Sequence, residues 1–283
     1  MTRPNPLSSM VTVADGSEAA VRRNRIAAEL AARFDARLTG AFPRPPLPVS
    51  VWDEPVYWGL PPTLPPAVPP EIMADHERRT DARAEEARLA FEAAAAAAGC
   101  RSDWLVLPAD GGAGFIDLAR RTDLTVLPSG RLPTVGPDAV DIALAAGGPA
   151  LILPGQDGAS APGRRIIVAW NGGREAARAV RDAWPLLSAA EAVHVVIVTP
   201  APVDGPDSRL QRYFEEHGCT ARVVVVREAD AGAAEVLRDQ VGALEADLVV
   251  MGLYGRSRLR ETVMGGVSRD LLRDPPVPLL VSH

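Results

Sequence analysis

The chain of 283 residues contains no lysine, so all 30 of its basic side chains are arginine. This absence excludes chemistry that needs a lysine amine: a Schiff-base nucleophile, a pyridoxal anchor or the lysine of a Walker-type phosphate loop. The 36 acidic residues outnumber the arginines, which are scattered, and the formal net charge is -6. The composition argues against a nucleic acid or an anionic membrane as the main partner.

Cysteine and histidine are also scarce. The two cysteines, Cys100 and Cys219, lie far apart, and the four histidines are isolated, so no metal-ligand spacing occurs. We therefore expect reduced, structural thiols and no metal site. His194 lies in the apolar stretch "VHVVIV", which favours a structural role over a catalytic one.

Long apolar runs are missing as well. The longest bland run, residues 93–98, is too short to span a bilayer, and the N-terminal residues lack the pattern of a secretory leader. We expect a cytoplasmic protein. Its length and its 47% hydrophobic content are sufficient for two packed domains.

Four segments of the chain recur in the same order, which indicates a duplicated domain. We expect one domain over residues 8–155 and a second over residues 163–283. The two cysteines occupy matching places in the repeat. The matched segments are 10–20 with 166–177, 99–107 with 218–226, 123–131 with 247–256, and 149–153 with 278–282.

Each copy contains short, nearly unbroken apolar stretches separated by helical patterns. Unbroken apolar strands predict burial on both faces, and hence a parallel sheet covered by helices on either side. The sequence therefore predicts an α/β fold made of two tandem doubly wound domains. The expected strands are 11–14, 104–107, 124–127, 166–169, 193–199, 223–226, 248–251 and 279–281.

The first copy carries a proline-rich insertion over residues 43–70, with Trp52, Tyr57 and Trp58 inside it. Its proline density excludes a regular helix or a central strand. A lid, a partner-binding arm and a loop that packs on its own domain all remain open. A long alanine-rich helix is expected over residues 75–98, with Asp75 as a candidate N-cap and Gly99 as its stop.

Glycines cluster after the penultimate strand of the second copy. Gly252 and Gly255 are expected to permit positive φ and to let amide groups converge on an anion. Gly265 and Gly266 precede a predicted helix whose N-terminus favours a phosphate. Candidate additional ligands of the phosphate are Ser268, Arg256 and Arg258.

The spacing Gly252-x2-Gly255-x9-Gly265, between "DLVVMG" and "PVPLLV", resembles the ATP-binding signature of the universal stress protein family. The resemblance implies Rossmann-like domains with five-stranded, mainly parallel sheets, frequent dimerisation through the last strand, and a role in surviving stress. Both an intramolecular pairing of the two domains and a homodimer are compatible with it. Carried over by position, it implies that Ala169, Trp170 and Asn171 face the adenosine, Met251 and Gly252 the sugar, and Gly255, Gly265, Gly266, Val267 and Ser268 the phosphates of ATP, with or without Mg²⁺.

This sequence departs from the family pattern in both copies. Asn171 stands where such domains usually carry an aspartate, as Asp15 does in the first copy, and Gly266 replaces a serine or threonine. The first copy has Pro128 in place of Gly252 and a shorter glycine loop, so a phosphate site there is not expected. We expect at most one nucleotide site per chain, in the second copy.

Sequence motifs of catalysis are missing: there is no Ser-His-Asp arrangement, G-x-S-x-G elbow or H-E-x-x-H run. Spacing does not single out a Mg²⁺ carboxylate among Asp204, Asp207 and Glu261. The sequence thus favours a stress-response regulator that binds ATP or a related nucleotide and at most hydrolyses it slowly. Two alternatives stay open: an interaction protein that needs no nucleotide and binds an unidentified protein partner, and an adenine-nucleotide-dependent enzyme.

Overall fold

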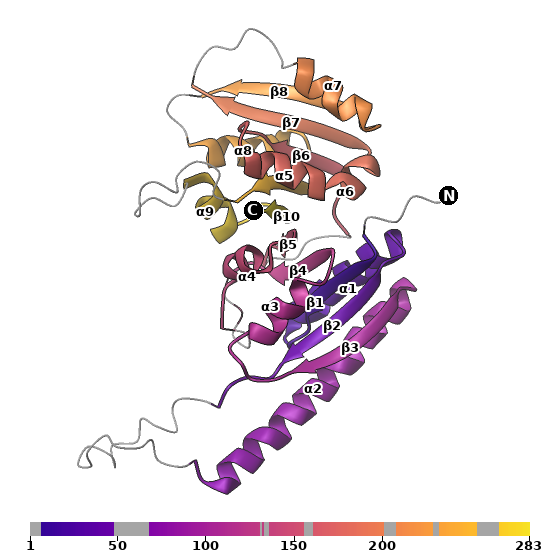
Figure 1. Cartoon of the computed structure of the whole chain (residues 1–283), viewed down its shortest axis with the longest axis vertical. Helices are drawn as coiled ribbons and strands as arrows, with labels where there is room; N and C mark the ends of the chain where they lie inside the picture. The colour runs from indigo at the N-terminus through magenta and orange to yellow at the C-terminus, as the bar shows by residue number, and fades with distance from the viewer. Residues whose placement is uncertain are drawn as a thin grey trace, which may run out of the picture.

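The computed structural model describes residues 7–47, 68–130, 132, 136–155, 161–200, 208–228, 232–253 and 266–283. Strands and helices alternate along both halves of the chain (Figure 1). The N-terminal half contains β1 (Ser9–Val13), α1 (Glu18–Arg33), β2 (Arg37–Pro43), α2 (Pro70–Ala98), β3 (Arg101–Leu107), α3 (Ala113–Ala119), β4 (Leu124–Pro128), α4 (Ala139–Ala146) and β5 (Ala150–Leu153). The C-terminal half contains β6 (Arg165–Ala169), α5 (Arg174–Asp182), α6 (Trp184–Ser188), β7 (Ala192–Thr199), α7 (Ser208–Glu216), β8 (Ala221–Arg227), α8 (Ala233–Ala243), β9 (Leu248–Gly252), α9 (Gly266–Arg273) and β10 (Leu279–Ser282).

The strands of the described residues form one ten-stranded sheet in the order β3-β2-β1-β4-β5-β10-β9-β6-β7-β8. Neighbouring strands within each half are parallel. The two halves meet where β5 and β10 pair antiparallel, with Leu151 opposite Leu280. The predicted α/β fold of two doubly wound units is confirmed, and the two units pair with each other inside one chain (Figure 1).

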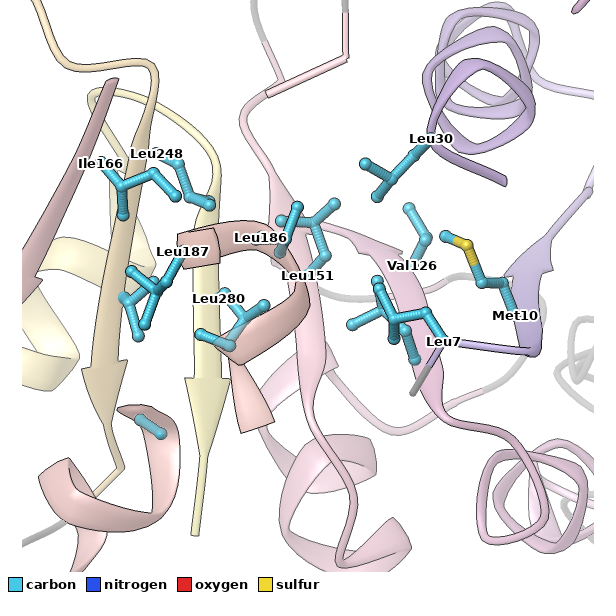
Figure 2. Close-up of a cluster of buried hydrophobic side chains, with 14 of the residues drawn as sticks. Leu7, Met10, Leu30, Val126, Leu151, Ile166, Leu186, Leu187, Leu248 and Leu280 are labelled. Atoms are coloured by element: carbon cyan, nitrogen blue, oxygen red, sulfur yellow. The ribbon is translucent and has the colours of Figure 1, made fainter. Parts of the chain in front are cut away.

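Apolar side chains fill both faces of this sheet. One cluster lies under α1, α5, α6 and α7, and the other lies under α3, α4, α8 and α9. Figure 2 shows the first cluster crossing the junction, where Leu151 and Leu280 lie between Val126 of one half and Leu248 of the other. Burying each such side chain contributes about 1.5–3 kcal/mol. The core therefore continues from one half into the other.

Burial on both faces is correct for the central strands but wrong for the two edge strands. In β3, Leu105 is 42% exposed and Val106 is 45% exposed, and most of β8 is only half-buried. An edge strand has one neighbouring strand instead of two. Helix cover is also incomplete there, so an unbroken apolar run does not guarantee full burial.

The sequence did not reveal β2, because Thr39 and Gly40 interrupt its apolar pattern. Gly40 has a long-range cause: a Cβ there would lie 2.8 Å from the ring of Phe91 on α2. The expected stop of α2 is confirmed, since Gly99 adopts a φ of 70°. Its expected start is wrong. The helix begins at Pro70 after the N-cap residue Pro69, and Asp75 instead pairs with arginines of the next turn.

The proline-rich insertion connects β2 to α2, and residues 48–67 lie outside the described part of the chain. Residues at its start contact α2, the helix that follows it. Arg44 pairs with Asp81, and His76 Nε2 lies 3.2 Å from the carbonyl oxygen of Pro45. Within the described residues, no helix is long and apolar enough to cross a membrane.

Polar side chains of α1 hold the segment that joins the two halves. Arg22 donates to the carbonyl oxygen of Gly155 at 3.0 Å, and Glu29 accepts from the backbone N–H of Ala161 at 2.9 Å. Arg33 donates to the carbonyl oxygen of Pro162, at the end of this segment, and to those of Gly163 and Ala189 in the C-terminal half, over 3.0–3.3 Å. Because side chains of α1 form hydrogen bonds with both ends of the connection, the N-terminal half positions the start of β6.

Candidate functional site

The predicted site residues gather around the ends of two neighbouring strands. β6 and β9 are adjacent and parallel, with Ala169 beside Met251. β6 continues to β7 on one side while β9 lies on the other, so the strand order reverses between them. In doubly wound sheets, this reversal at the carboxyl ends of the strands is where ligands bind. The structure therefore brings Ala169, Trp170 and Asn171 close to Met251 and Gly252.

The turn after β6 is shaped by Asn171. Its side-chain oxygen accepts a hydrogen bond from the N–H of Gly173 at 2.8 Å, and Gly172 has a φ of 73°. Gly173 is then the N-cap residue of α5. The side chain of Asn171 thus stabilises the turn that leads from the strand into the helix.

The first half repeats this turn with a charged residue. Asp15 accepts from the N–H of Ser17 at 3.1 Å and from its hydroxyl at 2.6 Å, while Gly16 has a φ of 75°. Ser17 is the N-cap residue of α1. The position shared by Asp15 and Asn171 therefore has a structural task in both halves.

A buried arginine lies beside the charged residue Asp15 of the first half. Arg23 is 3% exposed, donates to the carbonyl oxygen of Val13, and lies 3.5 Å from the Asp15 carboxylate. Burial lowers the pKa of the Arg23 guanidinium, whereas the Asp15 charge raises it. The matching residue of α5 is Ala179, which is fully buried and neutral. The aspartate and the arginine are thus replaced together in the second half.

Gly252 has a different role from the one expected. Its φ is not positive, so the expectation of a left-handed backbone is wrong at this position. A Cβ there would lie 2.4 Å from the backbone carbon of Glu175 and 2.6 Å from the nitrogen of Ala176. Glycine is required because α5 passes directly over the end of β9.

The other glycines of the motif are only partly placed. Gly255, Arg256, Arg258 and Gly265 lie outside the described residues. Gly266 is the first residue of α9, and Ser268 in its first turn is 8% exposed. Leu271 and Leu272 of α9 belong to the same apolar cluster as Met251. Val267 in the first turn of α9 packs against this cluster as well, so α9 covers the face of the sheet to which the cluster belongs.

Sequence reasoning missed a buried carboxylate beside this site. Glu175, in the first turn of α5, is 6% exposed and pairs with Arg174 at 2.5 Å. Arg174 lowers the pKa of the Glu175 carboxyl, and His283 contributes in the same direction. The hydroxyl of Ser282 is buried with no hydrogen-bond partner among the described residues. An acidic residue in a first helical turn was visible in the sequence, but its burial was not.

A backbone hydrogen bond joins the two sides of the glycine loop in the first half. Pro128 still belongs to β4 and pairs with Leu153 of β5. Gly130 and Gly136 have φ values of 81° and 94°, and the carbonyl oxygen of Gly130 accepts from the N–H of Ala139 at 3.2 Å. This geometry forms a turn into α4.

Burial shifts the pKa of three titratable groups outside this site. Burial lowers the pKa of His194, and the charges of Arg165 and Arg222 lower it further. Burial raises the pKa of both thiols, Cys100 and Cys219. Each cysteine follows a helix-ending glycine with positive φ, so their equivalence is structural. Among the described residues, no His, Cys, Asp and Glu side chains gather into a group that could hold a metal.

Residues 163–283 match the model of the universal stress protein family. The comparison with curated proteins gave no match. A universal stress protein from Archaeoglobus fulgidus superimposes with a TM-score of 0.67 at 15% identity, over 97% of this chain and 95% of that one. A Pseudomonas aeruginosa protein assigned to the same family gives 0.55 at 14% identity, over 98% and 93%. A universal stress protein in complex with cAMP gives 0.32 at 19% identity, over 53% and 98%.

The family match coincides with the half that holds the complete glycine spacing, and the solved structures share the fold of the whole chain. Residues 163–283 therefore form a domain that matches the universal stress protein family, and the whole chain shares the fold of these solved structures.

Proposed function

We propose that this protein is a cytoplasmic stress-response regulator whose C-terminal domain, residues 163–283, binds ATP or a related adenine nucleotide. The N-terminal domain, residues 8–155, acts as its structural partner. Nucleotide binding would change the conformation or the choice of protein partner, and any hydrolysis would be slow. The proposed ligands are Ala169, Trp170 and Asn171 for the adenosine, Met251 and Gly252 for the sugar, and Gly255, Arg256, Gly265, Gly266, Val267 and Ser268 for the phosphates.

One observation supports this proposal most strongly. Ala169 and Met251 lie side by side where the strand order reverses, and α9, which begins at Gly266, packs on the apolar cluster that also contains Met251. The N-terminus of a helix presents unpaired N–H groups and a partial positive charge, which favour a phosphate. A nucleotide lying across the strand ends would thus have its adenosine near Trp170 and its phosphates near Ser268.

The experiment is equilibrium dialysis of the nucleotide-free full chain against labelled ATP, with and without Mg²⁺. We expect one ATP per chain. Ser268→Ala should weaken binding about tenfold to a hundredfold, since it removes one hydrogen bond to a charged group. Ser188→Ala, an exposed serine at the end of α6, is the matched control and should bind as the wild type does. No binding at millimolar ATP would refute the proposal.

A second candidate function needs no nucleotide. The side-chain oxygen of Asn171 is already engaged by Gly173, and the glycine at position 252 is required by packing against α5. Both features would persist in a protein that works through protein contacts alone. In that case capture of its partner would be unaffected by ATP, and ATP dependence of that capture would exclude this candidate.

A further inference from the structure

The ends of β9 and β10 are attached to each other and to the first turn of α5. The two strands are neighbours (Figure 1), and α5 contacts both of them. The N–H of Leu253 donates to the carbonyl oxygen of Ser282 at 2.7 Å, and His283 Nδ1 lies 3.2 Å from the carbonyl oxygen of Leu253. Glu175 in the first turn of α5 packs directly against Gly252. His283 therefore lies where the chain leaves β9.

The hydrogen bond between His283 and Leu253 has a defined direction. A carbonyl oxygen can only accept, so Nδ1 of His283 carries the hydrogen and donates it. Because Ser282 binds the N–H of Leu253, the end of β10 holds both polar backbone groups of that residue. The backbone is thus fixed immediately before the glycine spacing, which continues two residues later at Gly255.

The first half has the same backbone arrangement without the histidine. The N–H of Ser129 donates to the carbonyl oxygen of Leu153 at 2.8 Å, as Leu253 does to Ser282 in the second half. The residue that follows Leu153 is Pro154, whose side chain has no hydrogen-bond donor. The half with the shorter glycine loop therefore cannot form this side-chain link, whereas the half with the complete glycine spacing forms it.

The change from proline to histidine is one of three changes from apolar to polar residues at this place. In the matching positions of the two halves, Ala19, Leu153 and Pro154 correspond to Glu175, Ser282 and His283. Arg174 lowers the pKa of the buried Glu175 carboxyl, and the charge of His283 lowers it further. The attraction between Glu175 and His283 connects the end of β10 to the first turn of α5.

We propose that His283 is a positioning residue of the nucleotide site: it fixes the backbone at Leu253 and holds the start of the glycine spacing beside the first turn of α5. The inference rests on the proposed binding of an adenine nucleotide by this domain. His283 acts through Leu253 and Glu175 and does not touch the ligand. Ordering this backbone before the nucleotide arrives lowers the cost of binding.

The first measurement uses the nucleotide-free full chain. His283→Ala should speed amide hydrogen exchange at Leu253 about fivefold, because the backbone there is held less firmly. His283→Asn should restore most of the protection, since its side-chain amide nitrogen lies close to the position of Nδ1. His76→Ala is the matched control: its ring also lies 3.2 Å from a carbonyl oxygen, that of Pro45, but in the other half.

The second measurement is equilibrium dialysis of the same variants against labelled ATP. His283→Ala should weaken binding about threefold to tenfold, the worth of one hydrogen bond. His283→Asn should recover most of this loss, and His76→Ala should bind as the wild type does. Glu175→Gln combined with His283→Ala should lose less affinity than the sum of the two single variants, because the two residues interact.

The two measurements separate this inference from the proposed function. Unchanged exchange at Leu253 in His283→Ala would overturn the role of His283 whether or not ATP binds. Wild-type affinity of His283→Ala for ATP would overturn it as well. A wild type that binds no ATP would refute the proposed function instead, and the exchange at Leu253 would then still decide whether His283 fixes that backbone. Thermal unfolding of each variant checks that folding is retained.

Discussion

Asp15 and Arg23 form an ion pair inside the N-terminal half, with 3.5 Å between the carboxylate and the guanidinium and only 11% and 3% of the two side chains exposed. The second half replaces the pair with Asn171 and Ala179, both neutral. The two changes belong together, because a buried arginine needs a counter-charge and a buried alanine does not. The absence of an aspartate at position 171 therefore has a structural cause that is independent of nucleotide binding.

Asp15→Asn should lower the free energy of unfolding by about 3 kcal/mol, since it leaves the buried guanidinium without its counter-charge. Asp15→Asn combined with Arg23→Met should cost less than Asp15→Asn alone. Urea unfolding of the two single variants and the double variant measures this coupling. Strictly additive losses would contradict the pairing.

Gly252→Ala should destabilise the protein by about 2–3 kcal/mol, because its Cβ would overlap the backbone of Glu175 and Ala176. Gly172→Ala is the matched control. Its Cβ would meet nothing within 4 Å, so only the cost of its φ of 73°, about 1 kcal/mol, is expected. Chemical unfolding compares them. A larger loss at position 172 than at position 252 would show that the close approach of α5 is not the constraint.

The fold was largely predictable from sequence because its signal is local and repeated. Unbroken apolar stretches marked most strands, and the recurrence of segments revealed the two halves. β2 was missed because Gly40 breaks its pattern, and the reason for that glycine is the ring of Phe91, far away in the chain. The helix α2 begins before the predicted N-cap Asp75, because Pro70 is its first helical residue and proline is favoured at that position.

The candidate site was less predictable. The sequence identified Gly252 but assigned it a left-handed backbone, since nothing local reveals that α5 crosses the end of β9. The sequence shows that Asp15 in one half corresponds to Asn171 in the other. It does not show that this change accompanies the change from Arg23 to Ala179, because these residues come together only through the turn between strand and helix. Roles that depend on long-range contacts could not be read from spacing.

His194 should make stability depend on pH. Its pKa is lowered in the folded state by burial and by two neighbouring arginines, so the unfolded chain binds the proton more readily. Stability from the neutral histidine is therefore complete above its ordinary pKa of about 6.5 and is lost as the pH falls from there toward the lowered value. His194→Gln should reduce the decline in unfolding midpoint between pH 7.5 and pH 5. If the decline in unfolding midpoint is unchanged in His194→Gln, other titratable groups cause it.

Arg33→Ala should weaken the attachment of the two halves, because the side chain donates to three carbonyl oxygens across the junction. We expect a loss of about 1 kcal/mol in unfolding free energy, modest because the side chain is exposed, and faster amide hydrogen exchange at residues 163–165. Arg33→Lys should recover only part of the loss, since an ammonium group lacks the planar fork. Unchanged exchange in Arg33→Ala would contradict a role in the junction.

The most direct test of the central claim is an NMR titration of the isotopically labelled, nucleotide-free full chain with ATP, following the backbone amide signals. The proposed site predicts saturable shifts at Trp170, Asn171 and Gly252 and in the first turn of α9 around Ser268, with the turn at Asp15 and Gly16 unaffected. Absence of any shift at millimolar ATP, or shifts confined to the N-terminal half, would contradict nucleotide binding by the C-terminal domain.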